Sequence, residues 1–301
     1  MDAVKKAILG EVLEEEEAYE VMRALMAGEV SPVRAAGLLV ALSLRGERPH
    51  EIAAMARAMR EAARPLRVHR RPLLDIVGTG GDGKGLMNLS TLAALVAAAG
   101  GVAVAKHGNR AASSRAGSAD LLEALGVDLE APPERVGEAI EELGFGFLFA
   151  PVRAELGVRT VFNLLGPLTN PAGADAYVLG VFSPEWLAPM AEALERLGAR
   201  GLVVHGEGAD ELVLGENRVV EVGKGAYALT PEEVGLKRAP LEALKGGGPE
   251  ENAALARRLL KGEEKGPLAD AVALAAGARL DARREGNECS DGCTPRWEAY
   301  A

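Results

Sequence analysis

Cysteine and aromatic residues are scarce in this chain of 301 residues. Its two cysteines, Cys289 and Cys293, lie near the C-terminus without a neighbouring histidine, so the sequence indicates neither a disulfide framework nor a zinc site. Aromatic residues account for 4% of the chain and hydrophobic residues for 48%. The core must therefore consist mainly of Ala, Leu and Val, which suits close packing of helices on strands.

Positive charge and long apolar runs are lacking as well. The net charge of -10 argues against broad nucleic-acid binding, because such binding needs a basic face. The most apolar stretch, residues 92–105, is interrupted by Gly100-Gly101 and is too short to span a bilayer. Early charges leave no apolar segment for a secretory signal. We therefore expect a cytoplasmic protein that has neither nucleic acid nor a membrane as its partner.

The first part of the chain, residues 1–68, is predicted to form a helical domain. Apolar residues recur there at the three- and four-residue intervals of a helix. Ser31 followed by Pro32 is typical of a helix start. We expect helices over residues 4–9, 19–26, 32–44 and 49–63. A terminal bundle with apolar faces offers a natural dimerisation surface, so we expect a homodimer.

From Leu73 onward, short apolar strands alternate with helices. This alternation predicts an α/β fold with a mostly parallel sheet covered by helices on both faces. Gly126, Gly144 and Gly198 stand where glycines commonly end helices. The expected strands are 73–77, 102–105, 145–149, 177–181 and 202–205, the expected helices are 118–125, 133–143, 185–197, 249–261 and 267–278, and a hairpin is expected over 218–222 and 226–230.

These patterns divide the chain into a small helical domain and a larger α/β domain. The α/β domain is expected to comprise residues 72–150 and 175–278. The intervening residues, about 151–172, are rich in Pro and Gly and break the α/β rhythm, so we assign them to the helical domain. Residues 279–301 carry no apolar stripe and are expected to form an irregular tail.

A glycine-rich stretch, Gly78-Thr79-Gly80-Gly81-Asp82-Gly83, follows the first strand and precedes a helix opened by Asn88 or Ser90. Ligands of such sheets bind beyond the carboxyl ends of the strands. The N–H groups of the loop and of the helix start would cradle a pyrophosphate. Lys106, expected just after the second strand, would bind further phosphate oxygens together with a serine loop.

Two common phosphate motifs fit this stretch poorly. A dinucleotide site requires an acid at the end of the next strand, where Lys106 stands. A P-loop requires Ser or Thr after its lysine, but Gly85 follows Lys84. A glycine-rich turn without a ligand is a third possibility, although so many glycines carry a large cost in backbone entropy.

Anionic phosphates in so acidic a chain call for a cation, and Mg²⁺ is the expected one. Asp210 and Glu211 follow the strand predicted at 202–205, where they could serve as its ligands. Adjacent acids on a solvated loop can equally be surface charge. Asp82 would accept from sugar hydroxyls or from metal-bound water, because a carboxylate repels phosphate.

Several motifs in this order resemble the anthranilate phosphoribosyltransferase family: GTGGDG, NLST, KHGNRAASS with Ser118, FNLLGPLTNP and HGEGADE. The resemblance runs from about residue 5 to about 277. It implies a helical domain and an α/β domain with a cleft between them, usually in a homodimer. It also implies that anthranilate attacks C1 of phosphoribosyl pyrophosphate and releases pyrophosphate. The alternatives are an enzyme similar to the pyrimidine nucleoside phosphorylases and a non-catalytic nucleic-acid-binding relative.

The resemblance also implies roles for individual residues. Lys106 would neutralise the leaving group, and His107 would either shuttle a proton or shape the loop. Two Mg²⁺ ions would be held by Ser90, Asp210 and Glu211, and anthranilate would meet Gly78, Asn109 and Arg153. Phosphoribosyl pyrophosphate would be bound by residues of the two loops: Gly78, Thr79, Gly81, Asp82, Asn88, Leu89, Ser90, Thr91, Lys106, His107, Gly108, Asn109, Arg110, Ala111, Ala112, Ser113, Ser114 and Ser118.

Three features depart from the family pattern. Leu86 stands where relatives usually carry a threonine. The chain runs directly from Phe149 to Arg153, where relatives have a short segment containing His-Pro near the acceptor. Residues 279–301 do not resemble the closing helices of the family.

Overall fold

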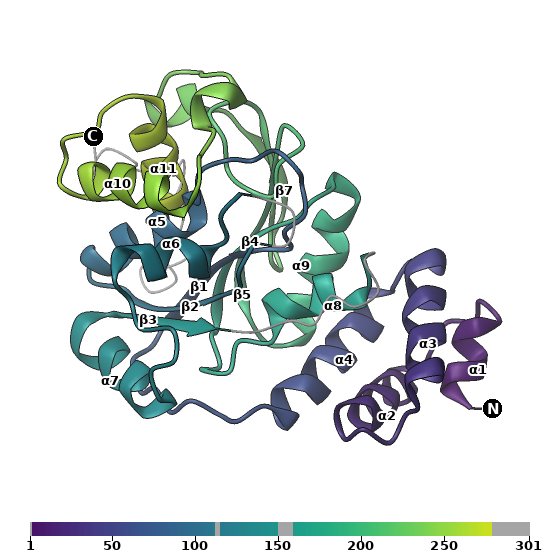
Figure 1. Cartoon of the computed structure of the whole chain (residues 1–301). Coiled ribbons are helices and arrows are strands. Elements are labelled where there is room, and N and C mark those ends of the chain that lie inside the picture. The colour runs from purple at the N-terminus through teal and green to yellow at the C-terminus, as the bar shows by residue number, and fades with distance from the viewer. Residues whose placement is uncertain (1, 112–114, 150–158, 279–301) are drawn as a thin grey trace, which may run out of the picture.

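The computed structural model describes residues 2–111, 115–149 and 159–278. The N-terminal helices lie beside a central sheet that carries helices on both faces (Figure 1). The four predicted N-terminal helices are confirmed. They are α1 (Ala3–Ile8), α2 (Glu15–Met26), α3 (Pro32–Arg45) and α4 (Pro49–Ala62). Helix α2 begins earlier than predicted because Glu14 and Glu17 form a capping box around an acidic first turn, which favours a helix N-terminus.

The sheet has seven strands in the order β3-β2-β1-β4-β5-β6-β7. The first five pair in parallel, and the last two form an antiparallel hairpin that extends the same sheet. The predicted mostly parallel sheet is thus confirmed. The strands are β1 (Leu73–Gly78), β2 (Ala103–Gly108), β3 (Phe145–Phe149), β4 (Ala176–Gly180), β5 (Arg200–Gly206), β6 (Asn217–Glu221) and β7 (Gly225–Leu229).

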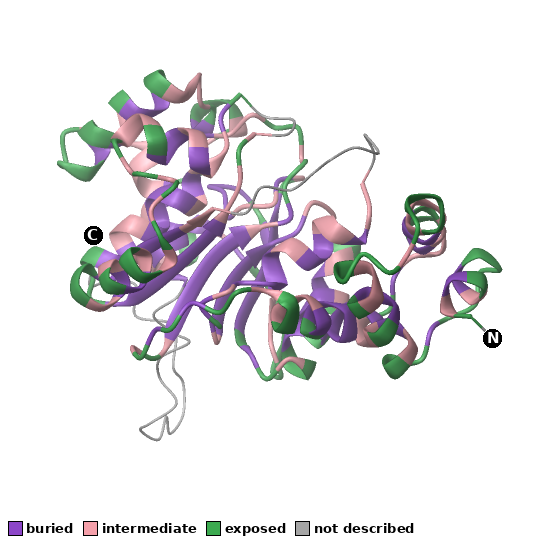
Figure 2. Cartoon of the chain, turned by 60° about the horizontal axis from the view of Figure 1, so that its bottom comes forward, coloured by how far each residue is buried: buried purple, intermediate pink, exposed green. Residues whose placement is uncertain are grey.

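Side chains of the central strands alternate between two buried layers. Ile76 packs in the layer of α5, α10 and α11, whereas Val77 packs in the layer of α4, α8 and α9. Figure 2 shows the strands buried on both sides. The helices are α5 (Leu89–Ala99), α6 (Ser118–Leu125), α7 (Pro133–Leu143), α8 (Val161–Leu165), α9 (Leu187–Arg196), α10 (Pro249–Leu260) and α11 (Pro267–Gly277), with 3-10 turns η1 (Gly166–Leu168), η2 (Pro184–Trp186), η3 (Pro231–Val234) and η4 (Leu241–Leu244).

The predicted end of the second strand is also wrong, and this boundary matters for the site. Strand β2 was expected to end at residue 105, with Lys106 and His107 in a loop, but it continues to Gly108. Lys106 pairs with Phe147 of β3, and His107 pairs with Leu148. Both polar residues are therefore buried within the sheet, on opposite faces because they are consecutive in the strand, and only 2% of Lys106 and 8% of His107 is exposed.

The segment that begins at Arg159 connects the helical domain to the sheet. Val161, Leu164 and Leu165 of α8 share one apolar cluster with α4, α9 and β4. Arg60 of α4 also donates to the carbonyl of Leu168, at 2.6 Å. Within the described ranges, no helix is both long and apolar enough to cross a membrane. The predicted irregular tail, 279–301, lies outside the described residues.

Candidate functional site

The glycine-rich loop begins where β1 ends. Gly80, Gly81, Gly83 and Gly85 adopt φ of +71°, +76°, +69° and +64°, a left-handed conformation that side chains rarely tolerate. The amide of Gly80 donates to Oδ2 of Asp210 at 2.6 Å. The loop thus exposes backbone donors and already uses one of them to hold a carboxylate.

Helix α5 begins directly after this loop. Its N-cap residue is Asn88, which is one of the two helix starts predicted from the sequence. The amide of Ser90 donates to Oε1 of Glu211 at 3.2 Å. Thr91 is fully buried, and its hydroxyl has no hydrogen-bond partner among the described residues. A helix N-terminus with an unpaired buried hydroxyl is a suitable place for an anion.

Lys106 lies below the loop in a buried polar cluster. Its Nζ donates to the carbonyl of Ile76 at 2.6 Å. Asp75 is also buried, and it accepts from Nδ2 of Asn170 at 2.8 Å and from the amide of His107 at 3.1 Å. Burial raises the pKa of Asp75 to about 6, against the opposing pull of the Lys106 charge. Burial likewise lowers the pKa of Lys106.

Sequence reasoning missed Asp75 and Asn170. The available signal was a carboxylate inside an otherwise apolar strand, which is rare unless the charge is paired. Asn170 also donates to the carbonyl of Ala105 at 2.8 Å and so holds both strands below the loop.

His107 is held as a neutral ring. Its Nδ1 lies 3.1 Å from the carbonyl oxygen of Gly166, which can only accept, so Nδ1 carries the proton. Burial lowers the pKa of His107 to about 4. A proton shuttle through this ring would therefore have to use Nε2.

The residues after β2 turn back toward α6. Arg110 directs its guanidinium to Asp120 at 3.1 Å and Glu123 at 2.7 Å, and these carboxylates raise the pKa of Arg110. The hydroxyl of Ser118 donates to the carbonyl of Asn109 at 3.4 Å. Ala111 donates its amide to Asp120 at 2.9 Å. Carboxylates of α6 thus hold Arg110, whereas Nζ of Lys106 is held by the carbonyl of Ile76 in β1.

A tight turn after β5 presents the two candidate metal ligands. Glu207 and Gly208 have φ of +48° and +86°, and the amide of Ala209 closes the turn on the carbonyl of Gly206 at 2.9 Å. Asp210 then reaches the glycine loop and Glu211 reaches α5. This arrangement brings Glu211 to Ser90 and Asp210 to Gly80, and a metal site at Ser90, Asp210 and Glu211 stays a prediction.

The chemistry of this pair fits a divalent cation. Burial and the charge of Glu211 raise the pKa of Asp210, and burial raises the pKa of Glu211 to about 7. Two partly buried carboxylates lose this penalty when a cation neutralises them. No cluster of three or more Asp, Glu, His or Cys side chains suited to a metal occurs in the described part of the chain. Phosphate and water would have to complete the coordination, as is common for Mg²⁺.

Arg159 is a third residue that sequence reasoning missed. Its guanidinium donates to the carbonyl of Gly81 and lies 3.6 Å from the ring centroid of Phe182. Ser43 of α3 donates to its carbonyl at 3.2 Å. Arg159 therefore connects the helical domain to the glycine loop. The predicted site residues Ala112, Ser113, Ser114 and Arg153 lie outside the described residues.

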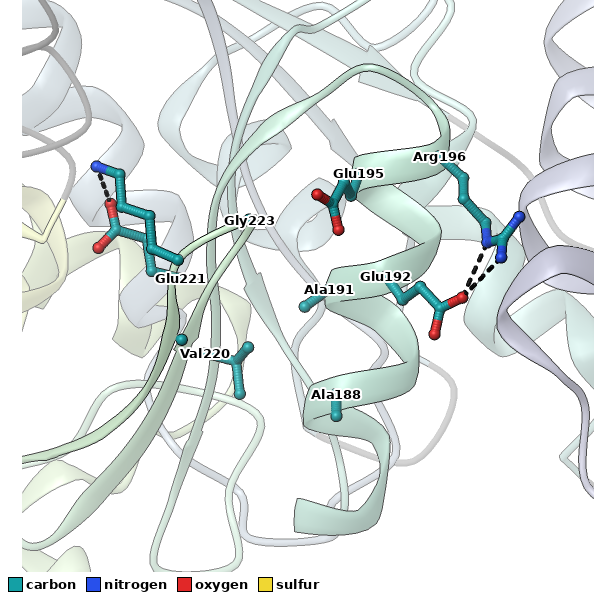
Figure 3. A pocket seen from close by; sticks show the side chains of 10 residues that line it. Ala188, Ala191, Glu192, Glu195, Arg196, Val220, Glu221 and Gly223 are labelled. Atoms are coloured by element: carbon teal, nitrogen blue, oxygen red, sulfur yellow. Dashed lines mark hydrogen bonds and ion pairs between the residues drawn. The ribbon is translucent and has the colours of Figure 1, made fainter.

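A surface hollow of about 610 Å³ lies away from these loops, between α9 and the β6–β7 hairpin (Figure 3). Four of its charged side chains form two ion pairs, Glu192 with Arg196 at 2.9 Å and Glu221 with Lys224 at 2.9 Å. None of the predicted site residues lines it. The candidate site is therefore the meeting point of the glycine loop, α5, the end of β2 and the acidic turn.

Both parts of the chain match one family. The glycosyl transferase helical bundle domain matches residues 1–63, and the glycosyl transferase a/b domain matches residues 70–296. The chain thus has the two-domain architecture of this class of glycosyl transferases.

More specific matches refine the class. Anthranilate phosphoribosyltransferase from Thermus thermophilus is 96% identical over 289 residues, which cover 92% of this chain and 88% of that protein. A crystal structure of the enzyme from the same species has a TM-score of 0.91 at 95% identity and covers 94% of this chain and 89% of its own. The enzyme from Saccharomyces cerevisiae in complex with PRPP and Mg has a TM-score of 0.82 at 28% identity, covering 95% and 86%. The chain belongs to the anthranilate phosphoribosyltransferase family.

Proposed function

We propose that this protein transfers the phosphoribosyl group of phosphoribosyl pyrophosphate to the amine of anthranilate, a step of tryptophan biosynthesis. The observation that carries the proposal is the partly buried Asp210–Glu211 pair, held by amides of both the glycine loop and α5. Such a pair supports a divalent-cation site beside the proposed phosphate cradle. The family membership supports the transferase over a phosphorylase or a nucleic-acid-binding relative.

The residues of the site suit leaving-group departure from C1. Amides of the glycine loop and the start of α5 bind the pyrophosphate, and Lys106 faces its developing negative charge. The weakly basic aromatic amine needs no prior deprotonation, so the chain supplies positioning rather than a nucleophile or an essential general base. His107 stays neutral and shapes the end of β2.

Mg²⁺ is part of this proposal, because the yeast relative was solved with PRPP and Mg. Ser90, Asp210 and Glu211 would hold two ions. When bound, Mg²⁺ supplies Lewis-acid stabilisation of the pyrophosphate. Asp82, whose carboxylate accepts from the amide of Lys84 at 3.0 Å, is left for sugar hydroxyls or metal-bound water.

Anthranilate fluorescence gives the direct test. With phosphoribosyl pyrophosphate and Mg²⁺ present, we expect the fluorescence to fall with time, and we expect no change without either one. A folded sample that leaves anthranilate unchanged, or one that cleaves uridine or thymidine with phosphate instead, contradicts the proposed reaction.

A homodimer through the helical domain completes the proposal. Val33 and Leu44 of α3 are each 84% exposed, and Leu9 at the end of α1 is 60% exposed. Such exposed apolar side chains on one small domain suit an interface with a second copy.

Introducing charge on this face should separate the subunits. We expect Val33→Asp with Leu44→Asp to halve the mass measured by light scattering. Leu143→Asp is the matched control, because Leu143 is 75% exposed on α7, outside the helical domain, and should leave the mass unchanged. A double variant that keeps the mass of the unmodified dimer rules out this face, and a monomeric parent protein rules out the dimer.

A further inference from the structure

Asn252 of α10 is buried against the start of α5, although no motif for the site contains it. The segment before α10 runs along the end of the glycine loop: Met87 donates its amide to Leu244 at 2.8 Å, and Gly246 donates to Gly85 at 3.0 Å. Only 2% of Asn252 is exposed. The Cβ of any side chain at position 246 would lie 3.0 Å from both amide atoms of Asn252. The segment before α10 can therefore pass this close to Asn252 because residue 246 is glycine.

Two side-chain amides form a hydrogen-bonded chain at this point. The amide N–H of Gly247 donates to Oδ1 of Asn252 at 2.7 Å, and Nδ2 of Asn252 donates to Oδ1 of Asn88 at 3.1 Å. Nδ2 of Asn88 then donates to the carbonyl of Ala116 at 2.9 Å. This series of hydrogen bonds begins at the N–H of Gly247, which can only donate, and ends at the carbonyl of Ala116, which can only accept. Both amide orientations are therefore determined.

We infer that Asn252 is a positioning residue that turns the NH₂ group of Asn88 toward the loop between β2 and α6. The inference rests on the proposed function, in which that loop and α5 bind phosphate between them. Asn88 is partly exposed, unlike Asn252, and so can meet a ligand. Its NH₂ group keeps a second N–H for a phosphate oxygen, whereas an amide oxygen in the same place would repel the phosphate.

The alternative is that Asn252 only stabilises the contact of α10 with α5. Asn252→Asp separates the two roles. The variant keeps the acceptor for Gly247, but a carboxylate cannot donate to Asn88, so the Asn88 amide turns its oxygen toward the phosphate. We expect the Kd for phosphoribosyl pyrophosphate, measured by calorimetry, to rise about tenfold, or about 1.4 kcal/mol. The KM for anthranilate should change little.

The added charge needs two controls. Ala254→Asp places the same charge on an exposed position of α10 and should leave the Kd unchanged. In an Asn88→Ala background, Asn252→Asp should cause no further loss, because a residue acting through Asn88 has nothing left to orient. Additive losses in the double variant would overturn the inference and leave only a charge effect.

Asn252→Ala covers the case in which the aspartate variant does not fold. It frees the Asn88 amide to rotate, so we expect a smaller rise in Kd than for Asn88→Ala. An unchanged Kd would overturn the inference. Because calorimetry reads phosphoribosyl pyrophosphate binding without anthranilate, failure of the proposed transfer reaction would appear separately, as normal binding without turnover.

Discussion

Replacing Lys106 with methionine is expected to lower the free energy of unfolding by about 3 kcal/mol and to abolish measurable turnover. The stability loss follows from burial: Lys106 is 2% exposed, and its charge compensates Asp75 and Glu211. Methionine fills a similar volume but leaves these carboxylates without a cation. The activity loss follows from the proposed role of Lys106 against the leaving pyrophosphate. Urea unfolding and the fluorescence assay measure the two effects.

The pH dependence distinguishes the charge from the packing. Because the folded-state pKa of Asp75 is raised from 3.8 to about 6, the folded chain holds this proton more tightly than the unfolded chain. Stability therefore falls as pH rises from about 4 through 6. Without Lys106 the pKa rises further, which extends the fall to higher pH. The stability difference between Lys106→Met and the parent should be smaller at pH 5 than at pH 8.

Lys84→Met is the matched control, because Lys84 is exposed on the glycine loop and should alter stability by less than about 0.5 kcal/mol. Equal stability losses of Lys106→Met at pH 5 and pH 8 would show that Asp75 and Glu211 do not depend on this cation. Turnover of the Lys106→Met variant at the parent rate would remove Lys106 from the proposed phosphate site.

Lys106 also shows which part of the fold the sequence could not predict, namely the end of strand β2. Apolar periodicity and glycine positions predicted nearly every helix and strand, because they report directly on burial and on backbone freedom. A lysine after an apolar run looks like the start of a loop. Here the neighbouring strands β1 and β3 supply a counter-charge and a pairing partner, and neither is visible in the local sequence of β2.

The residues of the candidate site also divide into those that the sequence could predict and those that it could not. The positions of Asp210 and Glu211 could be predicted, because acidic residues that follow a strand of a parallel sheet lie at the edge of the sheet where ligands bind. Asn252 and Arg159 could not, because each acts on a residue far away in the chain, Asn88 and Gly81. Their roles depend on how α10 and the segment before α8 fold back onto the loops.

The second large effect concerns magnesium. The double variant Asp210→Asn, Glu211→Gln should have no measurable activity, either with or without Mg²⁺. In the absence of Mg²⁺ at pH 8, the same variant should unfold at a higher temperature than the parent. The reason is that two adjacent, partly buried carboxylates, each with a raised pKa, disfavour the folded state when they are ionised.

Thermal unfolding with and without Mg²⁺ tests this pair without any substrate. At a concentration one hundred times its Kd, Mg²⁺ should stabilise the parent by about 2.7 kcal/mol and the double variant hardly at all. Glu207→Gln is the matched control: Glu207 lies in the same turn but accepts from the amide of Glu216 at 3.2 Å, so the variant should keep the parent response. If the double variant still gains stability from Mg²⁺, the ion binds elsewhere, and the raised pKa values of Asp210 and Glu211 do not mark a metal site.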